Sequence, residues 1–232
     1  MKTLYKLQLA KLKKALDLNA LNKRAPSQML ILWVVSLVSC CGLSLSAAPA
    51  SAQAFCALRH PHRAQQLLFP GSDDLESFSE QVTIEHREAV LRELSFSIHK
   101  KELGLHTLYA VFKGNGEDRV HLGYIHVRSE EGEWGLIEVA WGLYPDLSVK
   151  KFVFQRCRET AKREAQGELF EKFLHRKDKA ELRAYLDTSG ENLKSPIPGL
   201  SEEAQDLGRR LIRSALKTIS VTRHVWPESI AP

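Results

Sequence analysis

The sequence predicts an α+β domain whose sheet is an antiparallel four-stranded meander flanked by helices. Two observations lead to this class. Between residues 107 and 157, four segments with strand-like alternation follow one another across short turns, and turns this short join antiparallel neighbours. On both sides of this stretch, apolar residues recur with helical spacing, and strands grouped apart from helices are typical of α+β folds.

Two helices are expected before the sheet. The segment "HPHRAQQLLFPGSDD" predicts a short helix that is broken at the "FPG" turn of residues 69–71. The segment "TIEHREAVLREL" predicts a second helix capped by Thr83, with an apolar stripe formed by Ile84, Val90, Leu91 and Leu94.

The four strands are expected at residues 107–113, 120–127, 134–143 and 148–157. The connections "GNG", "EEGE" and "YPD" separate them, and Gly, Asn, Pro and Asp are turn-forming residues. Because each connection is short, each strand is expected to pair with the next one in the chain.

Helical patterns return after the fourth strand. Residues 158–185 predict one or two amphipathic helices. Residues 201–219 predict a longer helix that is capped by Ser201 and carries acidic residues in its first turn, where the helix dipole favours them. Residues 223–232 show no regular pattern and are expected to form an irregular tail.

Residues 1–54 predict a targeting segment. A basic region precedes an apolar run of 18 residues, 29–46, and small residues follow at "APASAQA". This order is typical of a secretory signal peptide. An uncleaved membrane anchor and a lipoprotein signal at "LVSC" (residues 37–40) are the alternatives. All three place the domain in the periplasm or on the outer face of the inner membrane, with membrane contact if the segment is uncleaved or lipidated.

The basic charge of the chain is concentrated in this N-terminal segment. The formal net charge is +5, but residues 1–52 hold seven Lys or Arg and a single acid, Asp17. The remainder is close to neutral and has no basic stripe beyond that of solvated helices, so no nucleic-acid partner is expected.

The cysteines fit an oxidising compartment. Cys40 and Cys41 lie in the apolar run, so a cleaved chain keeps Cys56 and Cys157, which either form a disulfide or remain as two free thiols. The scattered histidines have no metal-ligand spacing, and no metal is assigned. The sequence contains neither a phosphate-binding glycine loop nor a G-x-S-x-G motif.

Six segments carry a resemblance to a known family through their order and spacing. They are "RAQQLLFPGSDD", "VTIEHREAVLREL", "VHLGYIHV", "IEVAWGLYPDLSVKKFVFQRCRE", "GELFEKFLHRKD" and "DTSGENLKS". With them, residues 55–222 resemble the extracytoplasmic FMN-binding domain. This domain occurs in a subunit of the sodium-translocating NADH:quinone reductase, in Rnf-type electron-transport complexes and in the regulator of nitrous oxide respiration.

The resemblance places a cofactor loop at "DTSGENLKS". Members of the family carry Asp-x-x-Ser-Gly-Ala-Thr there, and the Thr bears FMN as a phosphoester. Ser189 and Gly190 match this motif, whereas Glu191 replaces the Ala and Asn192 replaces the Thr. An Asn has no hydroxyl with which to form the ester, and Glu191 adds a negative charge beside a phosphate. Any bound FMN is therefore expected to be non-covalent, with Ser189, Gly190 and Asn192 at its site.

Arg158 and Glu159 match the end of the family's last strand and are expected to contribute to the cofactor pocket. Two functions follow from the resemblance. The first is an electron-transfer module that passes electrons to or from a membrane-associated redox protein. The second is a flavin-free descendant of the fold that acts as a periplasmic binding or assembly protein. Both describe an electron-transfer or accessory domain rather than a stand-alone enzyme.

Overall fold

The computed structural model describes residues 57–114 and 116–230. The predicted targeting segment, with its three alternatives, lies outside the described residues, and so does Cys56. Among the helices of the described part, none is long and apolar enough to cross a membrane.

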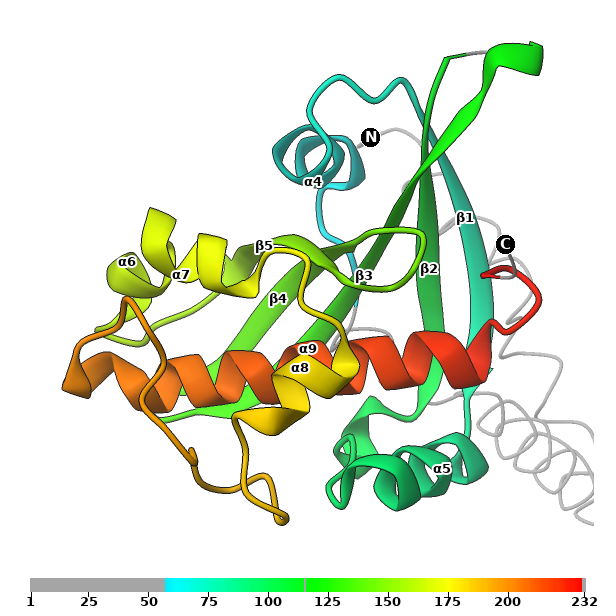
Figure 1. Ribbon diagram of the computed structural model, residues 1–232. Coiled ribbons are helices and arrows are strands. Elements are labelled where there is room, and N and C mark those ends of the chain that lie inside the picture. Colours follow the sequence, from blue (N-terminus) through cyan, green and yellow to red (C-terminus); the bar gives the residue numbers. More distant parts are fainter. Residues whose placement is uncertain (1–56, 115, 231–232) are drawn as a thin grey trace, which may run out of the picture. The chain divides into compact units, whose positions relative to one another are not determined.

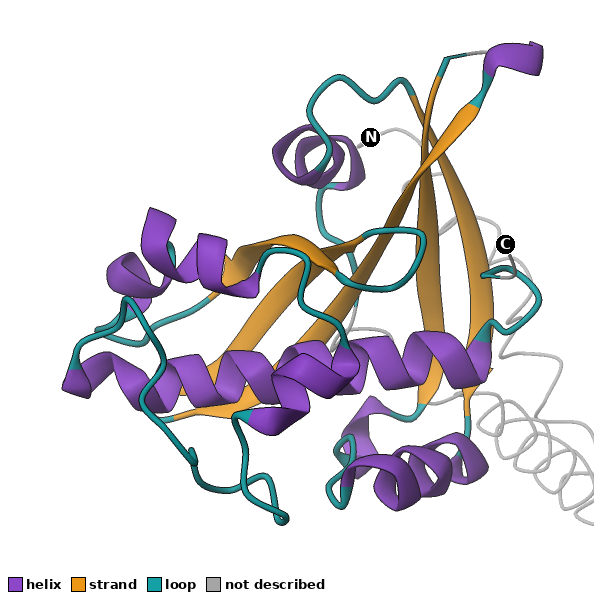
Figure 2. Ribbon diagram, viewed as in Figure 1, coloured by secondary structure: helices purple, strands orange, loops and turns teal. Residues whose placement is uncertain are grey.

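The sheet confirms the predicted meander and adds one strand to it (Figures 1 and 2). Its five strands lie in the order in which they occur along the chain, and all neighbours are antiparallel. They are β1 (Asp74–Val82), β2 (Gly104–Lys113), β3 (Val120–Gly132), β4 (Gly135–Leu143) and β5 (Val149–Arg156).

Strand β1 is the element that the sequence analysis did not predict. It pairs with β2 over its whole length, from Asp74 opposite Phe112 to Val82 opposite Gly104. Of the residues in β1, only Val82 is buried, because the strand lies at the edge of the sheet. Its sequence, "DLESFSEQV", therefore lacks the apolar alternation by which the other strands were identified.

The helices lie before and after the sheet, as predicted. Residues 158–185 form three short helices instead of one or two, and the last helix is longer than expected. The α-helices are α4 (Pro61–Leu68), α5 (Ile84–Leu94), α6 (Lys162–Ala165), α7 (Glu168–Leu174), α8 (Lys179–Ala184) and α9 (Gln205–Val225). Short 3₁₀ turns are η1 (Lys100–Glu102), η2 (Gly116–Asp118) and η3 (Glu202–Ala204).

The structure agrees with only some of the predictions made for the helix caps and the C-terminal tail. Thr83 occupies the N-cap of α5 as predicted, and its backbone N–H donates to His86 Nδ1 at 3.2 Å. Ser201 stands at the N-cap of η3, the 3₁₀ turn that leads into α9, but it forms no side-chain capping bond, because its hydroxyl donates to the Glu164 carboxylate at 2.9 Å. Helix α9 continues to Val225, so the first residues of the expected irregular tail are helical, and the Trp226 that follows is buried.

The two faces of the sheet pack against different helices. Helix α9 lies along one face, with α5 and α8 packed beside it (Figure 1). This face holds the larger core, in which Trp141 Nε1 donates to Ser214 Oγ of α9 at 3.0 Å. Alternate strand residues point to the other face, where α4 covers a smaller cluster: Leu58, Ala64, Leu68, Phe69, Val111, Ile125, Val127 and Ala140.

Candidate functional site

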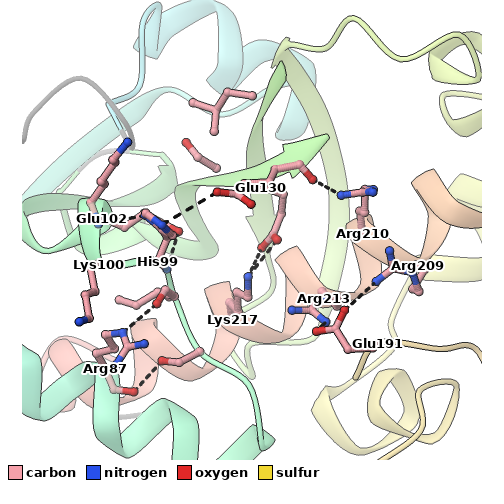
Figure 3. A pocket seen from close by; sticks show the side chains of 16 residues that line it. Arg87, His99, Lys100, Glu102, Glu130, Glu191, Arg209, Arg210, Arg213 and Lys217 are labelled. Atoms are coloured by element: carbon pink, nitrogen blue, oxygen red, sulfur yellow. Dashed lines mark hydrogen bonds and ion pairs between the residues drawn. The ribbon is translucent and has the colours of Figure 1, made fainter. Parts of the chain in front are cut away.

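A cavity of about 670 Å³ opens where the segment after α5, the end of β3 and one face of α9 meet (Figure 3). Its lining is strongly charged and contains more cations than anions. The cations are Arg87, Lys100, Lys101, Arg209, Arg210, Arg213 and Lys217, and the carboxylates are Glu102, Glu130, Glu131 and Glu191.

Two of these carboxylates are buried and neutralised beneath the cavity. Glu130 Oε1 and Oε2 lie 2.8 and 2.9 Å from Lys217 Nζ. Burial raises the pKa of Glu130, and the Lys217 ammonium opposes this shift. Glu102 Oε2 accepts from Arg128 Nη1 at 2.7 Å, and Arg128 is fully buried. The floor of the cavity is therefore close to electroneutral. Some of the cations above it are already paired: the Asp206 carboxylate lies 2.5 Å from Arg209 Nη2 and 2.6 Å from Arg210 Nε.

One wall of the cavity comes from α5 and η1. Ser97 Oγ donates to the Arg87 carbonyl at 2.6 Å, and Arg87 Nε donates to the Ile98 carbonyl at 3.1 Å, which fixes the direction of the guanidinium. Lys100 and Lys101 are exposed, and within the described part of the chain neither ammonium forms an ion pair. Their charges are therefore not compensated by a neighbouring carboxylate.

The opposite wall comes from α9, where Arg209, Arg213 and Lys217 follow one another at four-residue intervals and so share one helix face. Glu191 Oε1 lies 2.5 Å from Arg213 Nη1, and Glu191 Oε2 lies 3.7 Å from Arg209 Nη1. Glu191 thus brings the loop of the predicted cofactor motif to the edge of the cavity.

That loop is a closed, internally bonded turn. Residues 186 and 193 form an isolated antiparallel bridge, and the carboxylate of Asp187 is the centre of the turn. Asp187 accepts from Ser189 Oγ at 2.8 Å, from Asn192 Nδ2 at 2.8 Å and from the Glu191 backbone N–H at 3.1 Å. The side-chain bonds from Asn192 and Ser189 hold the pKa of Asp187 well below its ordinary value of 3.8. The polar side chains of Ser189 and Asn192 therefore serve the turn itself.

Gly190 is required by this turn on two grounds. Its φ is +75°, which disfavours residues with a Cβ, and an added Cβ would lie 2.3 Å from the Phe96 ring. Arg213 Nη1 donates to the Gly190 carbonyl at 2.7 Å, and its guanidinium carbon lies 4.7 Å from the centre of the same Phe96 ring. Phe96 therefore supports both the loop and the arginine of α9.

Gly190→Ala is expected to lower the free energy of unfolding by about 2 kcal/mol, from backbone strain together with overpacking against Phe96. Gly71→Ala is the matched control, since Gly71 has a φ of +80° and an added Cβ there would meet nothing within 4 Å. Urea denaturation of the two variants separates steric overlap from strain. Equal losses for both would show that Phe96 exerts no steric constraint.

The structure brings together only some of the predicted site residues. Ser189, Gly190 and Asn192 share the turn beside the cavity. Arg158 is exposed, and Glu159 accepts from the Trp134 backbone N–H at 3.1 Å near the turn between β3 and β4; neither residue lines the cavity. Their role in a cofactor pocket stays a prediction.

The predicted disulfide also stays a prediction. Cys157 is half-buried and follows β5, whereas Cys56 is outside the described residues. Burial raises the pKa of the Cys157 thiol, so this thiol is a weak nucleophile at neutral pH while it remains reduced.

The cavity fits one end of FMN better than the other. Its guanidinium and ammonium groups are the donors that a phosphate prefers. The only apolar side chains among the residues that line it are Ile98 and Leu136, and these lining residues include no Phe, Tyr or Trp. A flavin ring normally binds between apolar and aromatic side chains, so the isoalloxazine would project from this cavity. At the loop, Asn192 offers an amide where a phosphoester needs a hydroxyl.

Sequence reasoning missed the cationic residues, although one signal for them is visible. The four-residue spacing of Arg209, Arg213 and Lys217 places three cations on one face of a predicted helix. Arg87, Lys100 and Lys101 join them only through the packing of α5 against α9, which the sequence does not reveal.

Comparisons of the chain with protein-family models, with curated proteins and with solved structures give no match. The assignment of a function therefore depends on the cavity and its charges.

Proposed function

We propose that this extracytoplasmic domain is a binding module for an anionic small molecule that carries a phosphate group. The observation that carries the proposal is the excess of cations around a single cavity of about 670 Å³. This volume lies within the range of roughly 300–1,000 Å³ that is usual for small-molecule sites.

The arrangement of the cations suits a phosphate. Arginine donates in a planar fork that matches phosphate oxygens, and lysine supplies a compact charge. Lys100 and Lys101 have no carboxylate partner among the described residues, so a ligand can bind them without breaking an ion pair. The buried Lys217–Glu130 pair lies at the bottom of the cavity and contributes little net charge.

FMN belongs to this ligand class because its ribityl phosphate is a dianion. If FMN binds here without a covalent bond, the cofactor supplies the redox chemistry and the domain becomes an electron-transfer module for a membrane-associated partner. Within the protein, the cationic rim would hold the phosphate, and the loop at Gly190 would remain a structural turn.

The test compares FMN with riboflavin, which lacks only the phosphate. We expect FMN to bind at least about tenfold more tightly than riboflavin, because charge-assisted hydrogen bonds contribute about 1.5–3 kcal/mol each. Affinity is expected to fall as salt screens the rim. Quenching of flavin fluorescence measures both, and titration with inorganic phosphate reports on the anion site alone.

Lys100→Gln combined with Lys101→Gln is expected to weaken FMN binding by about tenfold or more. The matched control is Lys113→Gln combined with Lys194→Gln, which removes the same charge from exposed lysines outside the cavity. An equal loss of FMN affinity in both double variants would show that overall charge, and not the cavity, causes the effect. If the unaltered protein binds neither FMN nor inorganic phosphate, the proposed function is refuted. If it binds phosphate but not FMN, only the assignment of FMN as the ligand is refuted.

A further inference from the structure

Glu191 already places an anion between two of the arginines that line the cavity (Figure 3). Its carboxylate contacts Arg213 at 2.5 Å and Arg209 at 3.7 Å. The side chains of both arginines are only 14% exposed, whereas that of Glu191 is 60% exposed. The cations are thus fixed in the wall, and the anion that faces them is accessible to solvent.

The loop does not need the Glu191 side chain to keep its shape. The Asp187 carboxylate closes the turn through Ser189 and Asn192. Arg183 supports it from below by donating to the carbonyls of residues 186, 187 and 188 at 3.1, 2.5 and 2.8 Å. Contact with α9 is also kept by the Arg213 donation to the Gly190 carbonyl. The Glu191 carboxylate is therefore free to leave while the backbone stays in place.

An exposed carboxylate holds its arginines weakly, because water screens the pair and the side chain loses rotamer freedom in making it. Arg209 keeps a second partner, because its Nη2 lies 2.5 Å from Asp206 Oδ1. A phosphate dianion carries twice the charge of the Glu191 carboxylate and offers three oxygens to Arg213 and to the Nη1 side of Arg209, which faces Glu191. A monocarboxylate offers only what Glu191 already provides. Competition with Glu191 therefore favours dianions over monoanions.

We propose that Glu191 occupies the position of the ligand's anionic group, and that a ligand binds at Arg209 and Arg213 by displacing it. The inference depends on the proposed function and assigns a selectivity element to the same site. Glu191 acts as an internal competitor that lowers the affinity for every anion and excludes singly charged ones.

The experiment compares the unaltered protein with Glu191→Gln and Glu131→Gln in titrations with inorganic phosphate and with acetate. Glu131 is the matched control: it lines the same cavity and its side chain is 81% exposed, but its only ion pair among the described residues is a 4.0 Å contact with His99. Glu191→Gln is expected to bind phosphate about tenfold more tightly and to acquire measurable acetate binding. Glu131→Gln is expected to gain less than about threefold, from long-range charge alone.

The outcomes separate the two proposals. Equal phosphate affinities in the unaltered protein and Glu191→Gln would overturn the competitor role and leave the anion site intact. An equal gain in Glu131→Gln would also overturn it, because overall charge would then be the cause. If neither the unaltered protein nor Glu191→Gln binds phosphate, the proposed function fails and the competitor role fails with it. Circular dichroism and urea denaturation confirm that each variant is folded.

Discussion

Arg128→Met is expected to lower the free energy of unfolding by about 3–5 kcal/mol, because it leaves a buried carboxylate without its counter-charge. Arg128 of β3 is fully buried, and its Nη1 lies 2.7 Å from Oε2 of Glu102, which is itself only 4% exposed. Glu102 belongs to η1, the turn that carries Lys100 and Lys101. The Arg128–Glu102 pair therefore attaches this turn to the sheet. Phosphate affinity is therefore expected to fall together with stability.

Urea denaturation followed by tryptophan fluorescence measures the loss in Arg128→Met. Lys172→Met serves as the control: its 2.9 Å pair with Glu168 is exposed on both sides, and its removal is expected to have little effect. Replacing Arg128 by Met and Glu102 by Leu together removes both charges, and this variant is expected to be more stable than Arg128→Met alone. A double variant no more stable than Arg128→Met would show that the buried charge is not the source of the loss.

The second large effect is a loss of stability in acid caused by buried histidine. His106 is 4% exposed, and its Nε2 lies 2.6 Å from the Glu102 carbonyl. Burial, followed by the charge of Arg128, lowers the pKa of His106 from 6.5 to about 4. His126, which is fully buried against Thr222 and Trp226, has its pKa lowered in the same direction and by the same two causes.

The direction of the pH dependence follows from which state of the protein, folded or unfolded, binds the proton more readily. Below pH 6.5 the unfolded chain protonates His106, whereas the folded chain keeps it neutral until about pH 4. Stability is therefore fully present above pH 6.5 and declines as the pH falls toward 4, with about 3 kcal/mol lost through this residue. In His106→Gln, the slope of unfolding free energy against pH between 6.5 and 4 is expected to be shallower than in the unaltered protein. Identical slopes would exclude His106 as the source.

The parts of the fold that depend on residues close together in the sequence could be predicted. The meander follows from turn residues between alternating segments, and those interactions are local in the chain. The edge strand β1 could not be found, because Ser77, Ser79 and Gln81 face solvent and leave no apolar period. The extension of α9 was missed because Val221 and Thr222 are weak helix formers, and their burial overrides this preference.

The candidate site was predictable in the same limited way. The turn at Ser189 and Gly190 could be recognised, because Ser-Gly after Asp is a local signal. The sequence could not show that Asp187 uses the side chains of Ser189 and Asn192 internally. Nor could it show that Glu191 faces Arg213, since that contact joins a loop to a helix through tertiary packing alone.

Helix α9 follows all five strands in the sequence, and this order determines how the domain can be completed. The strands pair with their neighbours in the sequence, so the meander can form as soon as the chain is available up to residue 156. The larger apolar face of the sheet is covered only later, by Leu207, Leu211 and Ile219, which follow the strands in the sequence. Until the final helix docks, that face is open to chaperones, proteases and other nascent chains. A chain that stops before residue 205 therefore lacks the helix that lies along the principal core of the sheet.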